Sequence, residues 1–161
     1  MAAETAELAV HVEEFPVCEF VEKVVQLYLV SPVCENRWLF VEECPSFSIQ
    51  SDRTLMKRVL GNIIKNALEA APKHSAVSVS ALPSEGGVEF SVHNEGVIPA
   101  EIQAQIFQRS FSTKGAGRGL GTYSIKLLTE RYLGGRVRLI SNPDDGTIVR
   151  AWYPLTLKAP A

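Results

Sequence analysis

Two asparagines and one glutamate lie about one helical turn apart in the segment 52–71, and their oxygen atoms suit a hard metal ion. Asn62, Asn66 and Glu69 follow one another at intervals of four and three positions, so a helix would place them in one stripe. Such oxygens suit Mg²⁺, which keeps several waters and binds nucleotide phosphates. For each single asparagine the alternative is a structural role, in which an amide at the rim of the core bonds a neighbouring loop.

Four glycines alternate with other residues immediately before a second predicted helix. The sequence KGAGRGLGTYS carries them at 115, 117, 119 and 121, with the cations Lys114 and Arg118 beside them. Glycines let backbone N–H groups approach phosphate oxygens, and a helix N-terminus adds partial positive charge. No Lys-Ser/Thr pair follows and the G-x-G-x-x-G register fails, which excludes a P-loop and a dinucleotide-binding fingerprint. A flexible hinge explains one or two of these glycines, whereas four predict a phosphate-binding loop.

The stripe of polar residues belongs to a segment that is predicted to form one long helix. Ser51 or Asp52 is a suitable N-cap, and Pro72 ends the helix because proline cannot continue it. Asn66 falls at the edge of the apolar face of this helix, beside the core. That face recurs at intervals of three and four positions and comprises Leu55, Met56, Val59, Leu60, Ile63, Ile64, Ala67 and Leu68.

The rest of the chain combines helices with strand pairs. Helices are predicted at 17–29 and 123–133, a helical turn at 100–107, and strands at 8–12, 38–41, 77–82, 88–93, 136–140 and 147–153. Turn sequences at 85–87 and 143–146 join the last four strands into two hairpins. We therefore predict an α+β fold: a two-layer α/β sandwich with a mixed sheet of about five strands, covered on one face by three helices. The length of 161 residues fits a single domain over 1–161.

The connection between the two hairpins is long for a compact domain. Residues 94–121 make a segment of roughly 28 residues that shows no sustained periodicity, and connections of this length usually carry function, often as a lid. We expect the part at 97–118 to be a lid over a ligand. At its start, Asn94-Glu95-Gly96 ends a strand and turns sharply, which would hold a polar side chain at the floor of a pocket.

Composition excludes several classes of function. The formal net charge of −2 and the absence of a basic cluster argue against a nucleic-acid partner. No apolar run reaches the roughly 18 residues needed to cross a bilayer, so this segment is expected to make no direct membrane contact. Cys18, Cys34 and Cys44 match no zinc motif and are expected to be thiols in a reducing cytosol.

Four segments together resemble the ATP-binding domain of sensor histidine kinases, in the Bergerat-fold ATPase superfamily. NIIKNALEA resembles the N box, HNEGVIP the first glycine box, IFQRSFSTK the phenylalanine box and GRGLGTYS the second glycine box. Leu133-Gly-Gly-Arg-Val and Gly146-Thr147 resemble the hairpin that follows these boxes. The match runs in order from about Pro16 to Leu155, which implies a domain core of about 16–155 with the Bergerat ATP-binding fold.

The resemblance implies roles for individual residues. Asn66 matches the asparagine that ligates the Mg²⁺ bridging the ATP triphosphate, and Asn62 matches its companion near the metal and phosphates, so these two are the candidate catalytic residues. Gly96 matches the glycine that lets adenine lie close to the backbone. The candidate nucleotide-binding set is Asn62, Asn66, Asn94, Gly96, Lys114, Gly117, Arg118, Gly119, Leu120, Gly121 and Thr147.

Two positions depart from the family pattern. Asn94 stands where most members have an aspartate that accepts a hydrogen bond from the adenine amino group. An amide accepts through its oxygen, and turning it over presents a donor instead, so we expect weaker discrimination between ATP and GTP than an aspartate would give. Glu69 stands where some members have a phosphate-binding lysine, which makes a phosphate contact at position 69 unfavourable.

The implied activity is transfer of the ATP γ-phosphoryl to a histidine, with ATP and Mg²⁺ as cofactors. His11, His74 and His93 lack the sequence context of an acceptor histidine, so the acceptor is expected on a dimerisation domain of the parent kinase, with a response regulator downstream. The expected location is the cytoplasm, including the cytoplasmic portion of a membrane-bound sensor. The alternatives are a non-catalytic nucleotide-binding sensor or interaction module, and a serine-directed Bergerat-fold kinase, against which Phe111-Ser-Thr-Lys argues.

Overall fold

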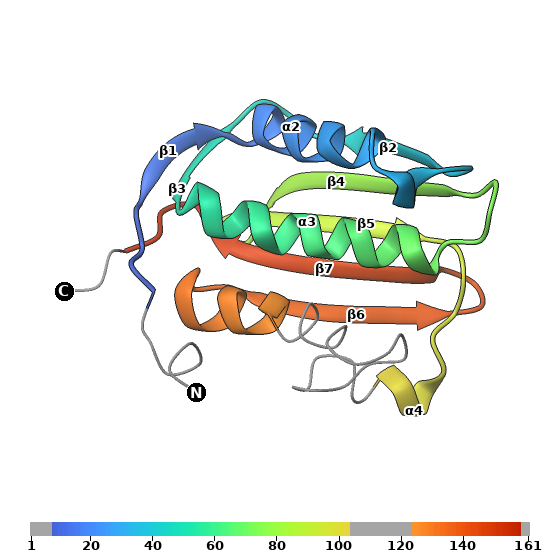
Figure 1. Cartoon of the computed structure of the whole chain (residues 1–161). Helices are drawn as coiled ribbons and strands as arrows, with labels where there is room; N and C mark the ends of the chain where they lie inside the picture. Colours follow the sequence, from blue (N-terminus) through green and yellow to red (C-terminus); the bar gives the residue numbers. More distant parts are fainter. Residues whose placement is uncertain (1–7, 104–123, 159–161) are drawn as a thin grey trace.

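Helices cover one face of a mixed five-stranded sheet in this computed structural model, which describes residues 8–103 and 124–158 (Figure 1). The strand order is β2-β4-β5-β7-β6, with β2 parallel to β4 and the other neighbours antiparallel. The strands are β2 (Trp38–Glu43), β4 (Ala76–Ser84), β5 (Gly87–Asn94), β6 (Arg136–Asn142) and β7 (Gly146–Pro154). The predicted α+β two-layer sandwich and both hairpins are confirmed.

The longest helix, α3 (Arg53–Ala70), packs its apolar side on β4 and β5. It begins where predicted because the Asp52 carboxylate accepts a hydrogen bond from the Leu55 backbone N–H over 2.9 Å. It ends at Ala70, because Ala71, immediately before Pro72, is extended. Every apolar residue predicted on the core face of this helix is buried.

The second helix of this layer is α2 (Val17–Leu29), also as predicted, and a 3-10 turn, η1 (Pro32–Cys34), follows it. The buried side of α2 contributes Phe20 to a row of aromatic rings in the core. The Phe20 ring centroid lies 5.2 Å from that of Phe15 and 6.1 Å from that of Phe90. Phe90 in turn contacts Tyr153 at 5.8 Å. Offset and tilted ring pairs of this kind stabilise a core beyond the area that they bury. No helix within residues 8–103 and 124–158 is long and apolar enough to span a membrane.

The third helical segment differs from the prediction in its last turn. Residues 124–127 are α-helical, but η2 (Leu128–Tyr132) is a π-helix. The wider turn places Thr129, which is fully buried, against the hydroxyl of Tyr153 at 2.8 Å. The helical turn predicted at 100–107 is present as α4 (Ala100–Gln103), and its remaining residues lie outside the described part of the chain.

A second, two-stranded sheet joins β1 (Glu13–Pro16) to β3 (Ser48–Ser51). The prediction of a strand at 8–12 is wrong: the strand begins at Glu13, where Phe15 pairs with Ile49 and both are buried. The sequence pattern did not reveal β3. This strand is only four residues long, and it depends on a partner more than thirty positions away. This small sheet lies at the end of the molecule where α3 begins (Figure 1).

The cysteines also differ from the prediction. Cys18, in the first turn of α2, forms a disulfide with Cys44, which follows β2, and their Cα atoms are 5.6 Å apart. Cys34 is a buried free thiol. The expectation of three thiols is therefore wrong for two of them, because the fold brings together residues 26 positions apart.

Candidate functional site

The two asparagines of α3 lie at the border between its buried side and solvent. Asn62 and Asn66 are both half-buried, with Ile63 and Ala67 beside them in the core. Within residues 8–103 and 124–158, the hydrogen bonds include none from either side-chain amide. Two amide oxygens on one edge of a helix, with no protein partner there, fit the ligand preference of a hard cation such as Mg²⁺.

The end of β5 turns sharply beside the C-terminal end of α3. Asn94 is buried, and its Nδ2 donates a hydrogen bond to the backbone carbonyl of Glu95 over 2.6 Å. Gly96 has φ +110°, a conformation that side chains rarely allow. A Cβ on Gly96 would lie 3.6 Å from the carbonyl oxygen of Ala70, so this turn directly adjoins the helix that carries Asn66.

A row of three hydrogen bonds fixes this turn to the β6–β7 hairpin. The Ile98 N–H donates to Ser141 Oγ over 2.8 Å, Ser141 Oγ lies 2.8 Å from Thr147 Oγ1, and the Thr147 hydroxyl donates to the Gly96 carbonyl over 2.9 Å. Because a hydroxyl carries a single hydrogen, Ser141 must be the donor to Thr147. The hydroxyl hydrogen of Thr147 is therefore engaged, and Thr147 can meet a ligand only as an acceptor.

Gln103 anchors the short helix α4 to the same network. Its Nε2 donates to the carbonyl of Ile98 over 2.7 Å and to that of Ser141 over 3.1 Å. Neither Gln103 nor Ser141 was among the candidate residues from the sequence. Ser141 lies one residue beyond the strand predicted at 136–140, and its pairing with Thr147 appears only in the structure. Gln103 belongs to a segment without a strong periodicity.

The structure thus brings together three of the candidate residues, Asn94, Gly96 and Thr147, next to the end of α3. The other two described candidates, Asn62 and Asn66, lie along that helix. The remaining candidates lie outside the described residues, as does most of the predicted lid: Lys114, Gly117, Arg118, Gly119, Leu120 and Gly121.

Comparison with known families decides what kind of site this is. The model of the histidine kinase-, DNA gyrase B- and HSP90-like ATPase family matches residues 51–157, which include α3 and the turn after β5. The chain belongs to this ATPase family. Membership in the ATPase family implies that the domain binds ATP. This agrees with the two amides on α3 that have no hydrogen-bond partner within residues 8–103 and 124–158.

Two sequence relatives place the chain in the histidine kinase branch of this ATPase family. It is 34% identical over 110 residues to the sensor histidine kinase ZraS of Escherichia coli (strain K12), covering 68% of this chain and 23% of that protein. It is 33% identical over 116 residues to sporulation kinase C of Bacillus subtilis (strain 168), covering 71% and 27%. The chain therefore spans about a quarter of the length of these relatives.

Solved structures agree with the sequence relatives. The nucleotide-free catalytic domain of the histidine kinase ThkA superposes with a TM-score of 0.79 at 26% identity, covering 92% of this chain and 99% of that one. Full-length ShkA in complex with AMPPNP has the same fold, with a TM-score of 0.83 at 22% identity, over 98% of this chain and 34% of that one. The chain is an ATPase-family catalytic domain of the sensor histidine kinase type.

Proposed function

We propose that this domain binds ATP with Mg²⁺ and transfers the γ-phosphoryl group to a histidine on a dimerisation domain of its parent kinase. The observation that carries the proposal is the position of Asn66. It is half-buried on the edge of α3, has no hydrogen-bond partner among the described residues, and lies one turn before the end of the helix that Gly96 adjoins. A nucleotide could then extend from the turn after β5 along this edge of α3.

The catalytic contribution of the domain would be positioning and charge neutralisation. Asn66 would ligate Mg²⁺ through Oδ1, and Asn62, one turn earlier, would hold the metal's water shell or the phosphates. When bound, the metal supplies positive charge to the phosphate oxygens. Phosphoryl transfer needs little more from a protein than this alignment and neutralisation, because charge spreads over the transferred oxygens.

The purine would be bound by the turn after β5. Asn94 donates through Nδ2 to Glu95 and so keeps Oδ1 to accept a hydrogen bond from the adenine amino group. Gly96 would let the base lie against the backbone, and Thr147 would hold that backbone in place through its bond to the Gly96 carbonyl. This orientation of Asn94 favours an ATP-binding domain over the alternative of an interaction module that no longer binds a nucleotide.

The phosphates would meet the glycine-rich segment. We retain the following residues as proposed phosphate contacts: Lys114, Gly117, Arg118, Gly119, Leu120 and Gly121. Backbone N–H groups of such glycines, together with the two cations, suit phosphate oxygens. We also retain 1–161 as one domain with a core of about 16–155.

The proposed partners follow from the kinase branch. The structure of histidine kinase ThkA in complex with the response regulator TrrA, at 25% identity and a TM-score of 0.80, shows such a kinase with its regulator. We propose that the parent kinase of this domain likewise passes its phosphoryl group to a response regulator, on the cytoplasmic side of the membrane.

Calorimetric titration with a non-hydrolysable ATP analogue, with and without Mg²⁺, tests the metal site. We expect Asn66→Leu to fold and to lose most of the Mg²⁺-dependent affinity, because the cation loses an oxygen ligand. The matched control is Lys57→Leu, an exposed position on the same helix, which should bind as the unmodified chain does. Unchanged affinity in Asn66→Leu would remove the metal assignment.

Phosphotransfer is tested separately. The isolated domain should not label itself, since its three histidines lack an acceptor context, but it should label a separately supplied dimerisation domain of its parent kinase. Acid-labile phosphate on the isolated domain, or none on the supplied domain despite normal ATP binding, would contradict the proposed reaction.

A further inference from the structure

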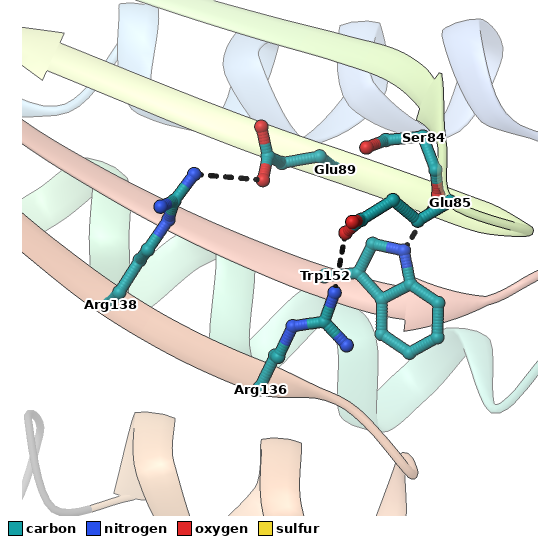
Figure 2. A network of polar contacts seen from close by, with 6 residues as sticks. All are labelled: Ser84, Glu85, Glu89, Arg136, Arg138 and Trp152. Carbon is teal, nitrogen blue, oxygen red and sulfur yellow. Dashed lines mark hydrogen bonds and ion pairs between the residues drawn. The ribbon is translucent and has the colours of Figure 1, made fainter.

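The face of the sheet that none of the described helices covers carries a cluster of arginines over β6 and β7. Register places Arg136 opposite Trp152 and Arg138 opposite Arg150. These side chains alternate with the buried Ala151 and Tyr153, so they point away from the helices. Figure 2 shows Arg136 and Arg138 extending over the strands toward Glu85 and Glu89.

One of the three arginines is fully engaged. The guanidinium carbon of Arg136 lies 4.3 Å from the centre of the Trp152 ring, and its Nη2 forms an ion pair with Glu85 at 2.7 Å. Trp152 is itself fixed, since its Nε1 donates to the Ser84 carbonyl over 2.7 Å (Figure 2). Arg136, Trp152 and Glu85 therefore hold one another in fixed positions at one end of the open face.

The positive charges of the other two arginines are balanced only in part by acidic side chains. Arg138 and Arg150 are directly opposite on adjacent strands, and like charges in such a pair destabilise a sheet. Arg138 reaches Glu89 only at 3.7 Å, which is longer than a charge-assisted hydrogen bond. The Nε of Arg150 is buried without a hydrogen-bond partner, and no ion pair of Arg150 occurs among the described residues.

A small cavity lies at this arginine pair. It has a volume of about 70 Å³ and is lined by Glu89, Arg136, Val137, Arg138, Arg150 and Trp152. A cavity needs about 10–15 Å³ in this measure to hold one water molecule, so this one has room for a group the size of one carboxylate. A carboxylate there would accept hydrogen bonds from both guanidinium groups.

The far edge of the same face is apolar. Trp38 is 68% exposed and Phe40 is 44% exposed on β2, and no helix within residues 8–103 and 124–158 covers either side chain. The row of Arg150 crosses the sheet through Ser91 and Ser80 to Glu43 on β2, and Phe40 lies in the next row of this face, opposite Ser78. With strands about 4.8 Å apart and two residues of about 3.3 Å each between the rows, Phe40 lies about 16 Å from Arg150.

We propose that this open face docks an acidic protein segment, which places one carboxylate between Arg138 and Arg150 and apolar side chains on Trp38 and Phe40. The chain as a whole carries a net charge of −2, so attraction of an acidic partner is local to this cluster. Glu85 and Glu89 beside the cavity would repel a dense anionic surface, which favours a single carboxylate over a membrane. The site lies across the sheet from α3 and does not depend on the proposed nucleotide site.

The probe is a synthetic helical peptide of about 14 residues, about 21 Å long, with a stripe of leucines and a single glutamate beside it. Binding is followed by fluorescence, since Trp38 and Trp152 are the two tryptophans of the chain and both lie on this face. We expect Arg150→Gln and Arg138→Gln each to weaken binding about tenfold, because a charge-assisted hydrogen bond is lost. Lys57→Gln, on the helical layer, should leave it unchanged, and all three variants should bind the ATP analogue normally.

Other outcomes would overturn the proposal. These are equal binding of the matching leucine–lysine peptide, or a response to inorganic phosphate or anionic lipid vesicles but not to the acidic peptide. Thermal unfolding without peptide gives an independent reading: Arg150→Gln should raise the melting temperature by relieving the Arg138–Arg150 repulsion. A lower melting temperature would show that Arg150 already has a structural partner, and the docking site would be rejected.

Discussion

Asn94 donates a hydrogen bond from its side-chain Nδ2 to the backbone carbonyl of Glu95 over 2.6 Å. This bond decides which end of the amide faces away from the backbone. Turning the amide over would bring two oxygens together and forfeit a bond worth about 1 kcal/mol. The neutral Asn94 is therefore held as an acceptor, although the residue type alone permits either orientation.

The first prediction concerns purine choice. The unmodified chain should prefer ATP to GTP, because the held Oδ1 accepts from the adenine amino group and repels the guanine carbonyl. Asn94→Asp loses the Nδ2 bond to Glu95, so its carboxylate must turn away from that carbonyl. Its charged oxygen should strengthen the bond to adenine by about 1 kcal/mol and increase this preference about fivefold. Competition of GTP against labelled ATP in both proteins measures the ratio. Equal rejection of GTP by both would show that position 94 does not read the base.

The second prediction concerns Thr147. Thr147→Val keeps the shape but leaves the Gly96 carbonyl and the Ser141 hydroxyl unpaired, which should lower the free energy of unfolding by about 1–3 kcal/mol. Amide exchange of Ile98 should accelerate as well, because the Ser141 that accepts its N–H loses its own partner. Thr147→Ser is the matched control and should behave as the unmodified chain. Normal exchange in the valine variant would contradict the network.

The third prediction concerns Asp52, whose carboxylate accepts from Leu55 N–H and from His11 N–H, both at 2.9 Å. Asp52→Ala should lower the free energy of unfolding by about 2 kcal/mol, through loss of the helix cap and of the second bond. Asp52→Asn can still cap α3 but has only one acceptor oxygen, so it should lose about half as much. Denaturant unfolding compares the three proteins, and equal losses in both variants would refute a dual role.

The fourth prediction concerns alkaline stability. Burial raises the pKa of Tyr153 above its usual value near 10. Below pH 10 the phenol is neutral in both states and its burial stabilises the fold. Above pH 10 the unfolded chain loses the proton first, so stability falls as pH rises toward the folded pKa. Tyr153→Phe should show a flatter decline between pH 10 and 11.5, at the cost of about 1 kcal/mol for the lost Thr129 bond. An identical decline in both proteins would assign the effect to other groups.

The sequence predicted those elements whose pattern is long and local. The helix α3 and the strand pair of β4 and β5 were found with nearly correct bounds, because caps, turn residues and periodicity lie within each element. The strand β3 was missed and the first strand was misplaced at 8–12, since the pairing of Phe15 with Ile49 joins distant segments. The π-turn at Leu128–Tyr132 depends on burial of Thr129 against Tyr153, which no local pattern records.

The features of the candidate site likewise fall into those that the sequence predicts and those that appear only in the folded chain. Asn66 could be selected from its position at the edge of a predicted apolar face, and Gly96 from the turn that it begins. The orientation of the Asn94 amide, the engaged hydrogen of Thr147 and the anchoring role of Gln103 all depend on atoms that meet only in the folded chain. The disulfide between Cys18 and Cys44 belongs to this second group.

The two ends of the described chain both meet the start of α3. The backbone N–H of His11 donates a hydrogen bond to Asp52, and the backbone of Gln50 on the adjoining strand β3 forms hydrogen bonds with Leu155 and Leu157. Any chain that continues from these ends would hold the domain at this one corner. Asn66 is fourteen residues further along α3, about 21 Å away at 1.5 Å per residue. Rotating the domain by about 10° about this corner would therefore move the proposed nucleotide site by about 4 Å. A small hinge movement could thus change the distance between a bound phosphate and its acceptor.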